Sequence, residues 1–137
     1  MGILVDTNVI IDFLLSREPF CEASTRVIKM CANGQLEGHV AFHSIPNLWY
    51  ILRKVPAQKR REWLLAICEF LQVDGVGHTD VVKAITMNEF EDFEDCLQDR
   101  CAVAVGAEYI ITRNTEDFKG SSTPAVTPEA FLEMKAE

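Results

Sequence analysis

Short apolar runs alternate with longer stretches of helical periodicity along this chain, and this alternation constrains the fold more than any other feature. The first run, Gly2–Val5, ends at Asp6 and is followed, after a polar turn, by a second apolar run, Val9–Leu15. A short strand, a turn and an apolar helix form the opening of a parallel α/β unit. Asp6 would then lie at the carboxyl end of the first strand, where ligands bind in open α/β sheets.

The rest of the chain continues this pattern. Further strands are predicted at Gly38–Phe42, around Val73, at Glu108–Thr112 and, as an edge strand, at Thr123–Val126. Further helices are predicted from Pro19 to Asn33, from His43 to Leu52, from Pro56 to Leu71, from Asp80 to Met87, from Asp92 to Gly106 and from Thr127 onwards. The expected helix caps are Thr7 or Asn8 for the first helix and His43–Ser44 for the third, with Pro19 in the first turn of the second. The pattern therefore predicts one α/β domain, residues 1–137, with a mostly parallel sheet.

The composition is that of a soluble globular protein. Hydrophobic residues make up 48% of the 137 residues and charged residues 25%, and charge interrupts the apolar runs well before the length of a bilayer span. The amino terminus lacks the basic region and cleavage site of a signal peptide. The chain has an odd number of cysteines, and no two of them are spaced as CxxC. This favours buried free thiols in a reducing compartment. These cysteines are Cys21, Cys31, Cys68, Cys96 and Cys101. We therefore expect a cytoplasmic protein that does not enter a membrane.

The net charge of −8 is unfavourable for binding nucleic acid, but the charge is unevenly distributed. Residues 89–95 contain five carboxylates, whereas residues 53–61 contain five bases and no acid. Such a pair of segments is compatible with metal-assisted phosphodiester chemistry, and two solvated helix faces would produce it as well. We favour a solvated surface for the basic stretch over a path for RNA, because no aromatic residues are interleaved in it to stack bases. Nearby aromatic and apolar residues are instead expected in the core. They are Trp49, Tyr50, Ile51 and Trp63.

Three acids occupy positions that can converge in a parallel sheet. Asp6 follows the first strand, Asp117 lies just beyond the strand that ends at Thr112, and Asp95 lies in the first turn of the helix that leads into that strand. Each acid alone is also explained as a helix cap or as a charge favoured by the helix dipole. Together they form a carboxylate cluster, whose repulsion a bound Mg²⁺ or Mn²⁺ ion would relieve.

Three segments resemble signatures of one known family, the PIN domains, which is the fold of VapC-type toxin ribonucleases. Val5–Asp12 is similar to the opening signature, Asp92–Leu97 to a later acidic helix start, and Ile110–Phe118 to the closing strand with its polar segment. The motifs occur in the order of the family and span nearly the whole chain.

The resemblance implies a three-layer α/β/α fold and metal-dependent cleavage of single-stranded RNA. It implies that Asp6, Asp95 and Asp117 are both the catalytic residues and the ligands of Mg²⁺ or Mn²⁺. Thr112 and Asn114 would be polar helpers that bind ligand or water. The resemblance further implies a homodimer and, if the chain is the toxin of a toxin–antitoxin pair, a partner peptide in the acidic groove.

The sequence also departs from the family pattern. PIN domains usually place a glutamate on the helix after the second strand, whereas Asn47 stands at the matching position here. Asn114 likewise stands where some relatives have aspartate. Loss of a carboxylate weakens the affinity for a cation, and Glu94 or Asp92 is our candidate to compensate.

Two other functions remain open at this point. The chain can be a non-catalytic PIN module that binds RNA or protein, and Asn47 in place of glutamate is the main support for this reading. A phosphatase of the HAD type also has an aspartate after its first strand. That family needs two aspartates separated by one residue, however, and Asp6-Thr7-Asn8 supplies only one.

Overall fold

A parallel sheet forms the centre of the protein in the computed structural model, which describes residues 1–136. Residue 137, the last of the predicted domain, lies outside the described residues. The sheet has the order β3-β2-β1-β4-β5, and every pair of neighbouring strands within these residues is parallel. The strands are β1 (Gly2–Val5), β2 (Glu37–Ala41), β3 (Gln72–Asp74), β4 (Tyr109–Ile111) and β5 (Ala125–Val126). The predicted strands and the α/β class are confirmed, and β1 lies in the middle of the sheet.

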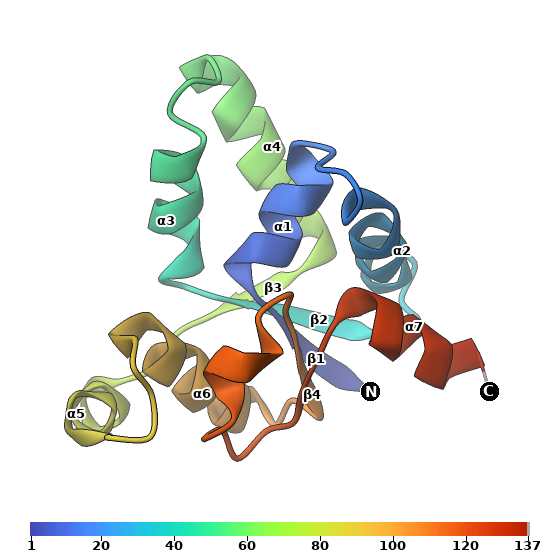
Figure 1. The fold of residues 1–137 in the computed structure, drawn as a ribbon. Coiled ribbons are helices and arrows are strands. Elements are labelled where there is room, and N and C mark those ends of the chain that lie inside the picture. Colours follow the sequence, from blue (N-terminus) through green and yellow to red (C-terminus); the bar gives the residue numbers. More distant parts are fainter. Residues whose placement is uncertain (137) are drawn as a thin grey trace.

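Helices cover both faces of this sheet and give the predicted three layers (Figure 1). One layer consists of α1 (Thr7–Leu14), α2 (Cys21–Ala32), α3 (Ser44–Ile51), α4 (Ala57–Phe70) and α7 (Pro128–Ala136). The other consists of α5 (His78–Thr86) and α6 (Phe93–Val105). A short 3₁₀ helix, η1 (Thr115–Phe118), follows β4. No helix within residues 1–136 has both the length and the apolar character that a membrane span needs.

Side chains along each strand point alternately to the two faces of the sheet, and apolar side chains form a core on each face. Ile3 and Val5 are fully buried against the layer that contains α1, whereas Leu4 is buried against α6. Gly38 in β2 allows a close approach of α2 and α4, because a Cβ atom there would lie 2.5 Å from Cys31 Sγ and from Leu71 Cδ2. The central strands are therefore held from both sides, and their carboxyl ends are fixed.

Several local predictions were wrong at helix starts. The N-cap of α1 is Asp6, whose side chain accepts from the Thr7 amide, and neither Thr7 nor Asn8 has this role. Pro19 lies in the turn before α2, which begins only at Cys21. His43 stands at the N-cap of α3 but makes no capping bond through its side chain.

The α3–α4 hairpin corrects two further predictions. It projects beyond the edge of the sheet (Figure 1), so parts of its surface have no sheet to pack on. Tyr50 is 65% exposed and Ile51 41%, so their expected place in the core was wrong. The two tryptophans are half-buried, and Trp63 packs against the core. Cys68 on α4 is exposed as well, and Cys21 is half-buried; the other three cysteines are buried as predicted.

Candidate active site

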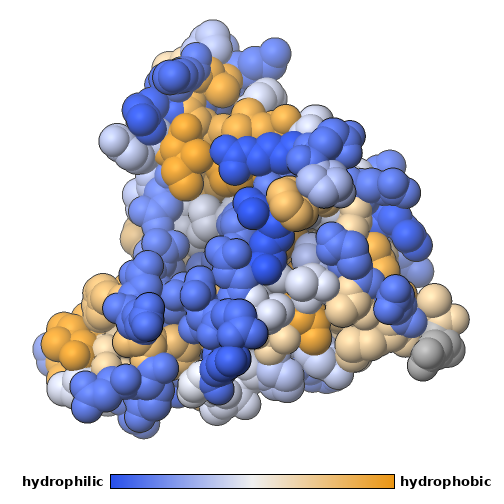
Figure 2. Space-filling model, in the orientation of Figure 1, coloured by the Kyte–Doolittle hydropathy of each residue, from blue (hydrophilic) through white to orange (hydrophobic). Residues whose placement is uncertain are grey.

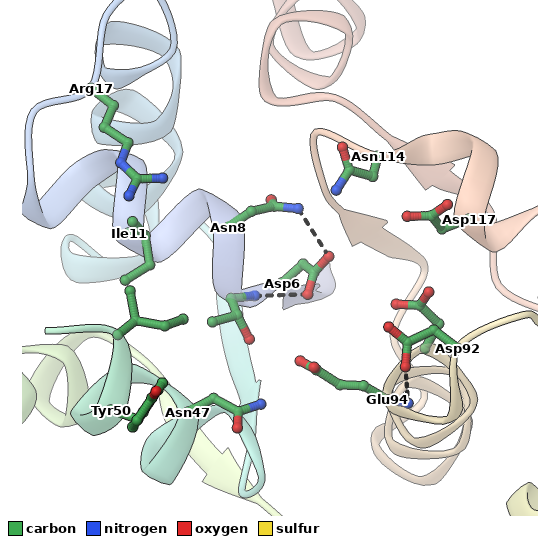
Figure 3. A pocket seen from close by; sticks show the side chains of 13 residues that line it. Asp6, Asn8, Ile11, Arg17, Asn47, Tyr50, Asp92, Glu94, Asn114 and Asp117 are labelled. Carbon is green, nitrogen blue, oxygen red and sulfur yellow. Dashed lines mark hydrogen bonds between the residues drawn. The ribbon is translucent and has the colours of Figure 1, made fainter.

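The predicted site residues gather at the carboxyl edge of the sheet, around a groove of about 430 Å³ (Figure 3). Asp6 enters it from the end of β1, Asn47 from α3, and Asn114 and Asp117 from the segment after β4. The amino-terminal turn of α6 contributes Asp92, Glu94 and Asp95. Thr112 is fully buried beneath the groove and hydrogen-bonds Asp6. The fold thus brings together all eight residues that the sequence singled out.

Asp6 is held in place by four hydrogen-bond donors. Its Oδ1 atom accepts from the Thr7 amide at 2.8 Å and from Gln98 Nε2 at 3.1 Å. Its Oδ2 atom accepts from Thr112 Oγ1 at 2.8 Å and from Asn8 Nδ2 at 3.3 Å. Burial raises the pKa of Asp6, and the negative charge of Asp117 adds to this, although the bonds from Thr112 and Thr7 oppose it. The carboxylate of Asp6 is therefore fixed in orientation, and a nearby cation would stabilise its ionised form.

Gln98 and Ser44 support Asp6 and were missed in the sequence. Gln98 is fully buried, and its Nε2 atom donates to Asp6 Oδ1 and, at 3.2 Å, to Ser44 Oγ. Ser44 Oγ also accepts from Thr7 Oγ1 at 2.8 Å. One signal was available, because a residue three positions after Asp95 on a helix lies on the same face. Within residues 1–136, Gln98 Oε1 has no hydrogen-bond partner although it is buried.

The start of α6 concentrates negative charge on one wall of the groove. Asp92 caps the helix and accepts from the Glu94 amide at 3.0 Å. The Glu94 side chain extends across the groove towards Asn47 (Figure 3). Burial and then the charges of Asp6 and Asp92 raise the pKa of Glu94, while a hydrogen bond with Asn47 lowers it. The carboxylate that α3 lacks thus has a counterpart that arrives from the opposite wall.

The ionisation of Asp95 is strongly disfavoured in the folded protein. Burial, and then the charges of Asp6, Asp92, Asp117 and Glu94, raise its pKa to about 7. Asp117, on η1, makes no side-chain hydrogen bond or ion pair with any residue from 1 to 136, so its oxygens remain free for a ligand. The arrangement is a set of carboxylates that repel one another.

Asn8 and Arg113 connect this wall to α1. Asn8 Nδ2 donates to Thr112 Oγ1 at 3.3 Å, and Asn8 Oδ1 accepts from the Arg113 amide at 3.2 Å. Arg113 forms an ion pair with Asp12, Nε to Oδ2 at 2.6 Å, and Asp12 is fully buried. The Arg113 guanidinium also lies 4.3 Å from the centre of the Phe20 ring. These contacts fix the loop after β4 and so the position of the polar side chains on it.

The donor set fits a hard divalent cation in its chemistry. The groove offers only oxygen ligands among its charged acceptors, which Mg²⁺ and Mn²⁺ prefer. As the side chains stand, no three histidine, cysteine, aspartate or glutamate residues among residues 1–136 are grouped closely enough to hold a metal. An ion would thus have to draw carboxylates of the groove, such as Glu94 and Asp117, closer together.

The raised pKa values predict how the stability of the metal-free protein depends on pH. Asp95 keeps its proton up to about pH 7 when folded but loses it near its ordinary value of 3.8 when unfolded. The folded state therefore binds more protons in this window, and the free energy of unfolding should fall as pH rises from about 4 to about 7. Urea unfolding in EDTA at several pH values will measure this.

The matched variants for this measurement are Asp95→Asn and Glu108→Gln. Asp95→Asn should make the decline shallower, because one of the carboxyl groups with a raised pKa is gone. Glu108 is exposed and precedes β4 at the other edge of the sheet, so Glu108→Gln should leave the decline unchanged. An equally steep decline in Asp95→Asn and in the unmodified protein would contradict the prediction.

Comparisons with known proteins place this geometry in context. The family model described as PIN domain matches residues 2–116. Ribonuclease VapC1 of Aquifex aeolicus (strain VF5) is 27% identical over 135 residues, which cover 96% of this chain and 93% of that protein. The match therefore extends over nearly the whole of both proteins.

Two solved structures share the fold. One is the structure of VapBC2 from Rickettsia felis bound to a DNA fragment from their promoter, with a TM-score of 0.72 and 15% identity over 93% of this chain and 98% of that one. The other is a toxin–antitoxin complex from Klebsiella pneumoniae, with a TM-score of 0.69 and 20% identity over 92% of this chain and 97% of that one. At these identities the likeness establishes the architecture alone.

Proposed function

Because this chain belongs to the PIN domain family, we propose that it is an endoribonuclease that needs a divalent metal and cleaves single-stranded RNA in the groove around Asp6. The observation that carries the proposal is the convergence of Asp6, Asp95 and Asp117 on one groove at the carboxyl edge of the sheet. The naming of the Aquifex aeolicus relative as a ribonuclease supports the same reaction class.

The metal would be Mg²⁺ or Mn²⁺, held by Asp6, Asp95 and Asp117. When bound, such an ion supplies activation of water and stabilisation of the charge that builds on the phosphate. Asp6 is oriented for this role because four donors fix both of its oxygens. Thr112 holds Asp6 through its hydroxyl and accepts from the Asn114 amide at 3.1 Å, so these two helpers position the site.

Glu94 takes the place of the glutamate that is usual on α3. Its side chain extends into the groove towards Asn47 (Figure 3), so a carboxylate enters the same space from α6. This argues for an active enzyme over a non-catalytic module, because the charge of the site is maintained by a different residue. Asp92 caps α6, and its main contribution to the site is the effect of its negative charge on the neighbouring carboxylates.

The chain would act as the toxin of a toxin–antitoxin pair in the cytoplasm. The two solved structures described above come from systems of this kind, VapBC2 and a toxin–antitoxin complex. A partner peptide that occupies the acidic groove would have to carry a cation to match the carboxylates there. A homodimer is the assembly we expect for the toxin. A small neighbouring reading frame that encodes a DNA-binding protein would support this assignment.

Metal removal tests the proposed reaction. Purified protein with Mn²⁺ should cut a labelled single-stranded RNA, and excess EDTA should stop the reaction, because the carboxylates alone cannot activate water. The Mn²⁺ concentration for half-maximal rate should rise in Glu94→Gln and stay unchanged in Glu108→Gln, which removes an equal charge far from the groove.

Other results would redirect the assignment. Cleavage that persists in EDTA would count against metal dependence. Absence of cleavage with Mg²⁺ and Mn²⁺, together with retained binding of RNA or protein, would favour the non-catalytic PIN module. An unchanged Mn²⁺ requirement in Glu94→Gln would show that Glu94 does not replace the missing glutamate.

A further inference from the structure

Basic and aromatic side chains border the groove on the wall that faces away from the carboxylates. Arg17 and Tyr50 line the same groove as Asp6 but lie on the side opposite to Asp92 and Asp117 (Figure 3). Arg53 and Lys54 line a second hollow of about 300 Å³, and Ile51 borders both cavities. We call Arg17, Tyr50, Arg53 and Lys54 the basic rim. It extends the site from the acidic floor towards the α3–α4 hairpin.

Tyr50 is an exposed aromatic platform with a fixed orientation. It is 65% exposed, and the Arg53 guanidinium lies 4.4 Å from the centre of its ring. Arg53 also donates from one terminal nitrogen to the Tyr50 carbonyl at 3.2 Å. The hairpin beneath is fixed by Arg60, which lies 3.9 Å from the Trp49 ring and donates to the carbonyls of Trp49 and Val55. The Tyr50 ring therefore lies at the groove without packing into the core.

The cations of the basic rim are not neutralised within the protein. Arg17, Arg53 and Lys54 form no ion pair with any carboxylate of residues 1–136, although the chain carries a net charge of −8. In contrast, Arg113 and Arg100 are paired with carboxylates. Figure 2 shows that this face of the molecule is hollowed between the α3–α4 hairpin and the α5–α6 layer, with hydrophilic side chains bordering the hollow. Free positive charge is thus available where the groove opens.

This arrangement corrects one premise of the sequence-based view of the basic stretch, namely that the bases have no aromatic neighbours. Trp49 and Tyr50 precede residues 53–61 in sequence, on α3, and the hairpin folds them against the bases. Arg61 lies 5.3 Å from the Trp49 ring and Lys59 lies 5.9 Å from the Trp63 ring. Aromatic and basic side chains are therefore interleaved in space, as surfaces that bind single-stranded nucleic acid require.

We propose that the basic rim binds the single-stranded RNA beside the cleavage site, with an unpaired base stacked on Tyr50 and flanking phosphates bound by Arg17, Arg53 and Lys54. The proposal rests on the proposed function only in taking RNA as the ligand. The physical reason is that the acidic groove repels phosphates, so cations next to it must hold the strand. Stacking on Tyr50 requires a base with a free face, which a duplex does not offer.

Fluorescence anisotropy with the full chain in EDTA tests this binding without cleavage. The probe is a labelled single-stranded RNA of roughly ten nucleotides, and a gel confirms that it stays intact. Tyr50→Ala should weaken binding by about tenfold, whereas Tyr50→Phe, which keeps the ring, should bind like the unmodified protein. Arg53→Ala/Lys54→Ala should weaken binding and lower the slope of log affinity against log salt by roughly 1.4.

The matched control is Lys29→Ala/Lys83→Ala, which removes the same charge from exposed positions on α2 and α5 and should leave the affinity almost unchanged. A duplex of the same sequence should bind more weakly and be insensitive to Tyr50→Ala. Circular dichroism and size-exclusion chromatography show whether each variant keeps its fold and its oligomeric state.

The proposal is wrong if folded rim variants bind RNA as tightly as the unmodified protein, and this outcome leaves the nuclease assignment intact. Equal losses in the rim and control variants would also overturn it, because they would reduce the effect to total charge. A rim variant that alters oligomeric state but not RNA affinity would identify a protein interface instead. Normal rim-dependent binding with no cleavage in Mn²⁺ would support the basic rim while rejecting the enzymatic activity.

Discussion

Replacing Asp6 with asparagine is expected to lower the rate of RNA cleavage about a thousandfold, which corresponds to roughly 4 kcal/mol of lost transition-state stabilisation. Asp6 is the central carboxylate of the groove and the only acid there whose two oxygens are both fixed by hydrogen bonds from the protein within residues 1–136. Asparagine keeps the shape but removes the charge that a divalent ion requires. Single-turnover cleavage of a labelled RNA at saturating Mn²⁺ measures the effect.

Folding controls separate loss of chemistry from loss of structure in this variant. The amide nitrogen of asparagine would face donors on one side of residue 6, at a cost of about 1–3 kcal/mol. This cost is opposed by removal of a buried charge whose pKa is raised by burial, so the chain should still fold. Asp80→Asn, on α5, is a matched substitution that should cleave normally. Undiminished cleavage by Asp6→Asn would place the chemistry elsewhere or reveal a contaminating nuclease.

Replacing Arg113 with methionine is expected to destabilise the protein by about 3–5 kcal/mol. Asp12 is fully buried, and its carboxylate accepts from Arg113 Nε at 2.6 Å and from a terminal nitrogen at 3.3 Å. Without Arg113 this charge stays buried and unpaired. Because total stability is usually about 5–15 kcal/mol, the loss should be visible as a large fall in the urea midpoint.

A double variant shows whether the pair or the unpaired charge determines this effect. Asp12→Leu/Arg113→Met removes both charges and should recover much of the stability that Arg113→Met loses. Lys119→Met breaks an exposed ion pair with Glu116 and should leave the midpoint unchanged. If the double variant is as unstable as Arg113→Met, the contact of the Arg113 guanidinium with the Phe20 ring is the larger contribution.

The part of the site that follows from the sheet was predictable from sequence. Asp6 and Asp117 follow strands of one parallel sheet, and the carboxyl ends of such strands share an edge, so their convergence needed only correct strand assignment. Asp95 could be placed because the acids at the start of a helix mark its amino-terminal turn, and this turn faces the same edge. Periodicity and polarity were sufficient at these positions.

The supporting contacts were not predictable because they join residues far apart in sequence. Gln98 bonds Asp6 across 92 positions, and its helical spacing from Asp95 indicates only a shared face, not this partner. Asp99, which is almost fully buried, accepts from Ser121 Oγ at 2.6 Å and from the Ser122 amide at 3.2 Å, and its neighbours suggest only an exposed helix acid. Likewise, the apolar residues of α3 reveal an amphipathic helix but not that the sheet ends beneath it.

The order of strands in the sheet has a consequence for how this protein is made. Strand β1 pairs with β2 on one side and with β4 on the other, and β4 is synthesised much later. At about 5–20 residues per second, Asp6 leaves the ribosome roughly 5–20 seconds before Asp117. A growing chain therefore has no complete carboxylate cluster until Asp117 has left the ribosome. A product terminated before Asp117 would lack one of the three carboxylates that the proposed reaction needs.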